Sequence, residues 1–110
     1  MAKSVTLEKR GLHWKTQTLA REHFVKMLHR YKRKQAVLPG SDHDDLLALL
    51  EIYDVSGTKR GSGVASFFLD ADREYGGTTD CFYVKRTDGS SEDFSVHKAV
   101  IYTSQIQNKK

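Results

Sequence analysis

Residues 81–94 have the sequence CFYVKRTDGSSEDF, and this stretch decides the kind of fold that the chain can form. Asp88-Gly89 is a strong signal for a tight hairpin turn, because its residues tolerate the positive φ that such a turn requires. An apolar run over Cys81–Lys85 precedes the turn, and an apolar pattern resumes over residues 93–101. We predict a strand before the turn, and after it a segment that is part strand and part helical turn.

Further strands are predicted on the N-terminal side of this hairpin. Val64–Leu69 alternates two sets of side chains, Val64, Ser66 and Phe68 against Ala65, Phe67 and Leu69, as a β-strand does. A short first strand is expected over Gly11–Thr16, and Tyr75-Gly76-Gly77 signals a turn.

Two helices are predicted between the first strand and Val64. The first spans residues 20–33, with Thr18 as its N-cap; its apolar stripe consists of Ala20, Phe24, Met27, Leu28 and Tyr31. The second begins at Ser41, where Ser41 and Asp44 match a capping box, and buries Leu46, Leu49, Leu50 and Tyr53.

The order β-α-α-β-β-β predicts an α+β fold in which two helices pack on a small, mostly antiparallel sheet. A length of 110 residues fits a single domain, 1–110, for which we expect a core over about residues 12–101 and flexible tails. The one cysteine, Cys81, permits no intrachain disulfide, and no apolar run has the length of a membrane helix. We therefore expect a cytoplasmic protein with no membrane association. The net charge of +4 permits binding to nucleic acid.

An ordered set of motifs resembles the "defective chloroplasts and leaves" (DCL) family of small domains, of the DUF3223 type. The resemblance covers about residues 12–101, and its most specific part is the run from Arg86-Thr87-Asp88-Gly89-Ser90 to Asp93-Phe94-Ser95. The other motifs are His23-Phe24, Arg30-Tyr31, residues 46–50, residues 59–64, Ser66-Phe67, Cys81-Phe82 and Lys98-Ala99-Val100. This chain has Ala99 where the family often has a cysteine or a similar residue.

The resemblance implies a link to RNA. Plant members of that family are tied to the maturation of plastid ribosomal RNA, and a similar module ends the largest subunits of plant-specific RNA polymerases. No catalytic residues are established for the family, so the resemblance implies none here.

Basic residues are the candidates for contacts with nucleic acid. Lys26, Arg30 and Arg33 are spaced to form one row on the first helix, with Lys32 and Lys34 at its end. Lys59 and Arg60 open a Gly-rich loop whose backbone amides could form an anion nest, and Arg86 begins the hairpin. The alternatives are a solvated helix face, an ordinary turn and an Arg86 side chain paired with a neighbouring acid.

Aromatic residues at Trp14, Tyr75, Phe82 and Tyr83 could stack on bases, although packing in the core is the more usual role in a strand. Phe82 and Tyr83 must point to opposite faces.

Metal and catalytic chemistry receive little support from the sequence. The five histidines and Cys81 lack the spacing of a zinc site, and Cys81 has no base beside it in sequence. Asp70, Asp72, Asp88 and Asp93 are the carboxylates that a metal or an acid–base reaction would use. We predict no cofactor, no metal and no catalytic residue.

Three hypotheses follow. The first is a non-catalytic accessory domain that binds RNA through Lys26, Arg30, Arg33, Lys34, Lys59, Arg60 and Arg86. The second is a protein-interaction module that uses residues 42–45 or a free sheet edge to bind a polymerase, ribonucleoprotein or host partner. The third is a metal-dependent nuclease.

Overall fold

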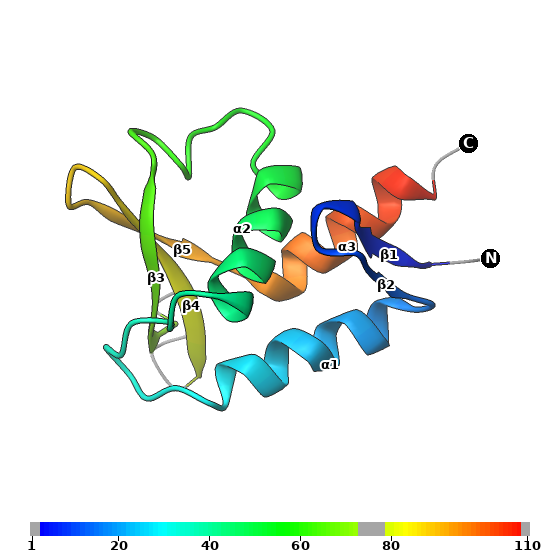
Figure 1. Ribbon diagram of the computed structural model, residues 1–110, viewed down its shortest axis with the longest axis horizontal. Helices are drawn as coiled ribbons and strands as arrows, with labels where there is room; N and C mark the ends of the chain where they lie inside the picture. Colours follow the sequence, from blue (N-terminus) through cyan, green and yellow to red (C-terminus); the bar gives the residue numbers. More distant parts are fainter. Residues whose placement is uncertain (1–2, 73–78, 109–110) are drawn as a thin grey trace.

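Three helices and two antiparallel sheets form the fold in a computed structural model that describes residues 3–72 and 79–108 (Figure 1). The elements are β1 (Val5–Leu7), the short 3-10 helix η1 (Glu8–Arg10), β2 (Leu12–Trp14), α1 (Gln17–Leu28), α2 (Ser41–Tyr53), β3 (Val64–Ala71), β4 (Asp80–Arg86), β5 (Ser91–Phe94) and α3 (Val96–Gln107). The α+β class and the antiparallel sheet are confirmed. None of these helices is both long enough and apolar enough to span a bilayer.

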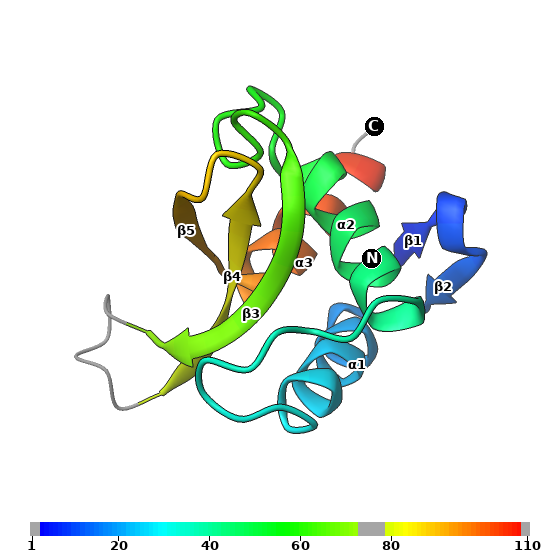
Figure 2. The ribbon, with the colours of Figure 1, turned by 60° about the vertical axis from the view of Figure 1, so that its left-hand side comes forward.

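The predicted hairpin joins β4 to β5 in a sheet of order β3-β4-β5. Arg86 N–H donates to Ser90 O at 2.8 Å, and Gly89 takes the positive φ of 89° that the turn needs. All three helices lie on one side of this sheet (Figures 1 and 2). The sheet therefore has an inner face, which carries the buried Phe67, Leu69, Phe82, Val84 and Phe94, and an outer face without a helix.

Residues 34–37 pair with the outer edge of β3 and so widen the sheet by one short segment. Val37 N–H donates to Phe67 O at 2.8 Å, Leu69 N–H donates to Gln35 O at 3.1 Å, and Ala36 is bridged to Phe68. These hydrogen bonds pair backbone N–H and C=O groups of β3 that an open sheet edge would leave without a partner. Of the two outer strands, only β5 keeps an edge without a described neighbour.

Helix α1 ends at Leu28, five residues before the predicted end at Arg33. The reason is Tyr31, which turns into the core, donates its hydroxyl to Asp42 Oδ2 at 2.6 Å and accepts from Leu38 N–H. At the other end the N-cap is Thr16, whose Oγ1 accepts from Leu19 N–H, and not Thr18.

Helix α2 starts at the predicted residue with a different cap. Gly40 occupies the N-cap position and no side chain caps it, so the capping box of Ser41 and Asp44 does not form. Of the predicted stripe, Leu46, Leu49 and Leu50 are fully buried, and Tyr53 is half-buried against the core.

The structure extends regular elements beyond the core expected over residues 12–101, into β1 at one end and the last turns of α3 at the other. Val5 and Leu7 of β1 are buried, and α3 continues to Gln107. The Gln107 side chain binds the backbone of Thr6 in both directions, accepting from Thr6 N–H and donating to Thr6 O, each at 2.8 Å. A carboxamide that pairs with a strand in this way replaces a missing neighbouring strand, and it joins the two ends of the domain.

Candidate nucleic-acid interface

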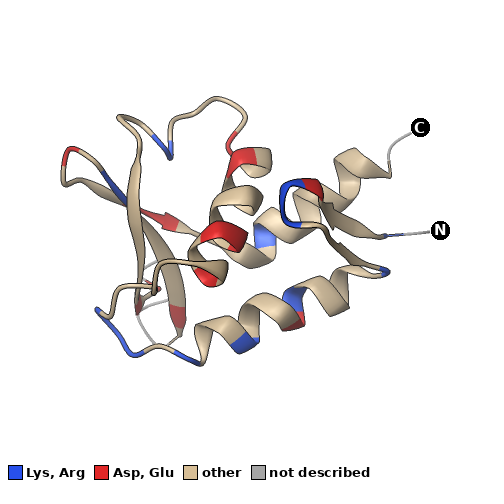
Figure 3. Ribbon diagram, viewed as in Figure 1, with Lys and Arg blue, Asp and Glu red and all other residues tan. Residues whose placement is uncertain are grey.

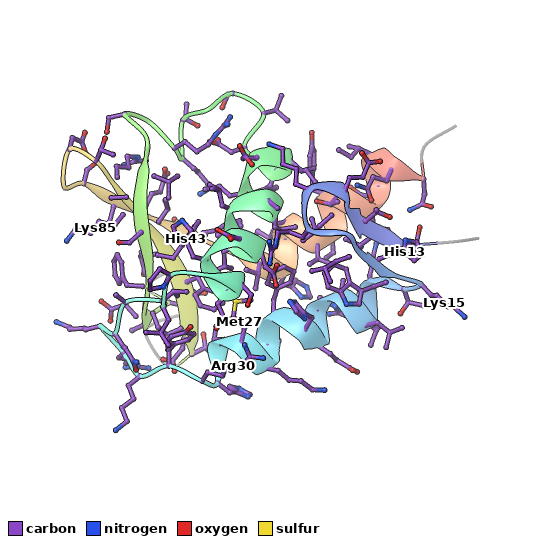
Figure 4. All side chains as sticks on the ribbon, in the orientation of Figure 1. His13, Lys15, Met27, Arg30, His43 and Lys85 are labelled. Carbon is purple, nitrogen blue, oxygen red and sulfur yellow. The ribbon has the colours of Figure 1, made fainter. Side chains whose placement is uncertain are left out.

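An open groove of about 430 Å³ lies between β2 and the exposed side of α1. Trp14 and His23 form its aromatic wall. Lys15, Lys26 and Arg30 line it with positive charge, which outweighs the single carboxylate of Glu22 in the same lining. Figure 4 shows Lys15 near the N-terminal end of α1 and Arg30 just beyond its C-terminal end. Figure 3 shows further basic positions along α1 and the segment that follows it.

The basic side chains in this groove differ in whether they already form an ion pair with a carboxylate of the protein. Arg30 Nη1 lies 2.7 Å from Asp42 Oδ1, although the Arg30 side chain is 55% exposed. Lys15 and Lys26 have no ion pair with any residue that the structure describes, and both are exposed. Two free ammonium groups are therefore available to phosphates, with Arg30 able to share its charge.

The aromatic wall of the groove is held rigidly from behind. The Trp14 ring centroid lies 5.0 Å from that of His23, and His23 Nε2 lies 3.0 Å from Asp45 Oδ2. Asp45 is buried and is also bound by Arg10 Nε at 2.7 Å. The His23-Phe24 motif thus positions β2 against α1 and α2, and Trp14 is presented on a fixed support.

The predicted row of Lys26, Arg30 and Arg33 is divided, because α1 ends before Arg30. Arg33 Nε lies 2.6 Å from Asp80 Oδ1 at the start of β4. Lys32 and Lys34 are exposed and have no ion pair within the described residues. The basic residues therefore form an irregular patch along α1 and the segment after it, and they do not form a straight row. The patch consists of Lys26, Arg30, Lys32, Arg33 and Lys34.

Lys59 and Arg60 lie outside this patch, in the loop between α2 and β3. The backbone N–H groups of both residues donate to the carboxylate of Asp54, at 3.1 and 3.0 Å, and Arg60 Nε joins them at 3.1 Å. Burial alone would raise the pKa of Asp54, but these backbone and guanidinium donors lower it below its ordinary value. The predicted anion nest exists, and its anion is Asp54.

Arg86 is bound within the same loop and hairpin. Its guanidinium donates to Lys59 O at 2.8 Å and to Glu92 Oε2 at 2.6 Å, and its side chain is 15% exposed. The alternative of pairing with a neighbouring acid is therefore confirmed. Gly61 is required beneath this side chain, because a Cβ there would lie 2.8 Å from Arg86 Cδ and the local φ is 48°.

The aromatic candidates separate as strand alternation requires. Phe82 is in the core on the inner face. Tyr83 is on the outer face but is also buried, at 8% exposed, and Tyr75 lies outside the described residues. Tyr83 stacks on Phe68, with centroids 5.3 Å apart and an interplanar angle of 14°. Phe68 was not among the predicted stacking residues, although its alternation with Phe67 already placed one of the two rings on the outer face.

Two of the candidate groups for metal or acid–base chemistry, Asp88 and the thiol of Cys81, have structural roles. Asp88 Oδ1 accepts from Ser90 N–H at 2.9 Å within the hairpin turn. Burial, with Asp72 nearby, raises the pKa of Cys81 to about 12. The described residues include no group of three His, Cys, Asp or Glu side chains that could hold a metal ion.

Comparisons with known proteins identify a family and two similar proteins. The family model described as "Protein of unknown function (DUF3223)" matches residues 25–100. A segment of DNA-directed RNA polymerase IV subunit 1 from Arabidopsis thaliana is 31% identical over 93 residues, which is 84% of this chain and 6% of that protein. The solution structure of an uncharacterized protein from Rhodospirillum rubrum has a TM-score of 0.72 at 30% identity, covering 91% of this chain and 89% of that one.

Proposed function

We infer the function of this chain from its family: it belongs to DUF3223, a family of proteins of unknown function. We propose that it is a non-catalytic accessory domain, which binds RNA in transcription or in ribosomal RNA processing. The observation that carries the proposal is the basic, aromatic-walled groove between β2 and α1. The similarity to a segment of a polymerase subunit and the resemblance to the DCL domains point in the same direction.

The groove suits RNA because it combines the two contacts that sequence-tolerant RNA binding uses. Lys15 and Lys26 supply charge for phosphates, and Trp14 supplies an aromatic ring held by His23. Lys34 is a further phosphate contact beyond α1. Arg30 and Arg33 contribute charge from their ion pairs, whereas Lys59, Arg60 and Arg86 act by holding the loop and hairpin in place.

The test is fluorescence anisotropy of a labelled single-stranded RNA at two salt concentrations, together with emission from Trp14, the only tryptophan of the chain. We expect binding that weakens with salt and quenches Trp14. The variant Lys15→Glu/Lys26→Glu should bind more weakly and lower the salt slope by about 1.4, which is about 0.7 for each lost contact.

Lys9→Glu is the control for charge reversal outside the groove, because Lys9 is an exposed lysine whose ion pair, within the described residues, is with Glu51 at the surface. It should bind RNA like the wild type. Absence of RNA binding at low salt would refute the proposal, and equal binding by the double variant and Lys9→Glu would refute the groove.

A protein-interaction role is the second candidate, favoured by the similarity to a segment of a polymerase subunit. Its surface would be the free edge of β5, since Asp42 and Asp45 already bind Arg30, Tyr31, Arg10 and His23. A polymerase partner captured from nuclease-treated lysate would support this role, and its loss on nuclease treatment would support RNA binding.

A further inference from the structure

The outer face of the β3-β4-β5 sheet has two adjoining hollows and no helix above it (Figure 2). Their volumes are about 410 and 450 Å³, and they share Phe68, Asp70 and Ser91. The first hollow is completed by Lys34, Ala36, Ser66, Lys85 and Gly89. The second is completed by Asp72, Tyr83, Glu92 and Asp93. One continuous surface is therefore basic at one end and acidic at the other, with an aromatic residue between the ends.

The aromatic centre of this surface is rigid. Phe68 is half-buried and stacks on Tyr83, and the Tyr83 hydroxyl donates to Ala71 O at 2.7 Å. The Tyr83 ring is therefore fixed by its hydrogen bond, and the Phe68 ring is fixed by Tyr83. A ring held in this way can receive a flat partner at little cost in side-chain entropy.

Two lysines border the Phe68 ring on the basic side. Lys34 and Lys85 line the same hollow and have no ion pair within the described part of the chain. Lys34 is placed by the segment along the β3 edge and is the only non-glycine residue described with a positive φ, 68°. Figure 4 shows Lys85 projecting from the sheet away from the helices.

We propose that this outer face binds single-stranded RNA, with a base stacked on Phe68 and the adjoining phosphates on Lys34 and Lys85. The inference rests on the proposed function and adds the class of RNA and a second contact surface. Only an unpaired strand can place a base on a ring, because bases of a duplex are stacked on their neighbours.

The acidic end orients the strand. Asp72 and Asp93 lie only in the acidic hollow and Asp70 lies where the two hollows meet, so phosphates are repelled from that side and the backbone lies toward Lys34 and Lys85. A base that stacks on Phe68 then points its edge toward the carboxylate of Asp70, which can accept hydrogen bonds from exocyclic amino groups. A cationic peptide is the other ligand that this end could take, and the experiment separates the two.

The experiment measures the affinity of the full chain for a labelled single-stranded RNA and for the same sequence in a duplex, using Phe68→Leu and Phe68→Tyr. Phe68→Leu keeps an apolar side chain and removes the ring, so we expect binding about 10-fold weaker. Phe68→Tyr keeps the ring and should bind within about 2-fold of wild type. Lys85→Glu should lower the salt slope by at least about 0.7, and Lys9→Glu should leave it unchanged.

A local reporter adds a second readout. In Trp14→Phe/Phe68→Trp, the sheet face carries the only tryptophan, and RNA should quench its emission. Each variant is first checked for a wild-type thermal transition.

The outcomes separate the two proposals. If wild type binds no RNA, the proposed function fails. If wild type binds RNA but Phe68→Leu equals Phe68→Tyr, or the duplex binds as tightly as the single strand, only this inference fails. Binding of an arginine-rich peptide that Asp93→Asn abolishes, with RNA affinity unchanged in Phe68→Leu, would overturn it in favour of a protein ligand.

Discussion

Replacing Asp54 by Asn should reveal how far the loop between α2 and β3 depends on one buried carboxylate. Asp54 is 5% exposed and accepts three N–H donors, from Lys59 N, Arg60 N and Arg60 Nε. Asn keeps one acceptor oxygen, and it turns an NH₂ group toward donors. Hydrogen bonds to a charged group contribute roughly 1.5–3 kcal/mol, so we expect a loss of about 2 kcal/mol in the free energy of unfolding at pH 7.

The assay is urea unfolding followed by circular dichroism at several pH values. The folded-state pKa of Asp54 is lowered, so its contribution is complete above the unfolded pKa near 4 and is lost as the pH falls through the folded value. The gap between wild type and Asp54→Asn should therefore be constant near neutrality and narrow progressively as the pH falls below about 4. Asp44→Asn is the control, since the Asp44 side chain is 51% exposed and 3.8 Å from Arg10. A gap that does not narrow as the pH falls below about 4, or equal losses in both variants, would refute the reasoning.

Three further perturbations follow from single contacts. Gly61→Ala places a Cβ against Arg86 at a positive φ and should cost about 1–2 kcal/mol in a thermal or urea melt, and a neutral result would contradict that packing. Gln107→Ala removes both hydrogen bonds to Thr6, so we expect a loss of about 1–2 kcal/mol and faster amide exchange at Thr6, and unchanged exchange would show that β1 is held by its apolar residues alone. The Cys81 thiol should resist iodoacetamide at pH 8 in the folded protein and react in urea, because burial raises its pKa to about 12, and rapid alkylation of the folded form would contradict this.

Local signals predicted the elements whose causes are local. The Asp88-Gly89 turn forms as expected because it depends on backbone angles that adjacent residues determine. Helix α3 was predicted only as a turn, because its buried side includes Thr103 and Ser104, which do not produce an apolar stripe. These small residues are buried because α1, α2 and β1 pack against the helix, as Figure 1 shows. That packing joins segments far apart in sequence.

In the candidate site, too, the sequence predicted what adjacent residues determine and missed what depends on contacts between distant segments. Composition identified the basic residues, and the short distance in sequence predicted that Arg86 pairs with a neighbouring acid, which is Glu92. The acid that engages Arg33 was not predicted, because Asp80 of β4 lies far from it in sequence. No sequence spacing within α1 could show that Arg33 faces Asp80, because α1 ends at Leu28. Lys15 was missed because it is a single charge in a turn, and its place in the groove depends on how β2 packs on α1.

Arginine and lysine side chains differ in their contacts in this domain. Every arginine that the structure describes has a hydrogen-bonding or ion-pair partner; they are Arg10, Arg21, Arg30, Arg33, Arg60 and Arg86. Five lysines without an ion pair in the described chain border the two proposed RNA surfaces or lie between them; they are Lys15, Lys26, Lys32, Lys34 and Lys85. Lys3, near the N-terminus, is also exposed and without an ion pair there, and it lies outside both surfaces.

The chemistry of the two side chains explains this division. A planar guanidinium offers several donors in a fixed geometry and suits permanent contacts, whereas an ammonium on a flexible stem stays hydrated until a phosphate displaces water and counterions. Arginine substitutions such as Arg30→Glu or Arg86→Glu should therefore impair folding together with any binding. Lysine substitutions separate the two effects: Lys26→Glu and Lys85→Glu should leave the thermal transition unchanged while weakening RNA binding at two different surfaces of the domain. If they destabilised the fold as much as the arginine variants did, the lysines would have structural partners and the assignment of both surfaces would fail.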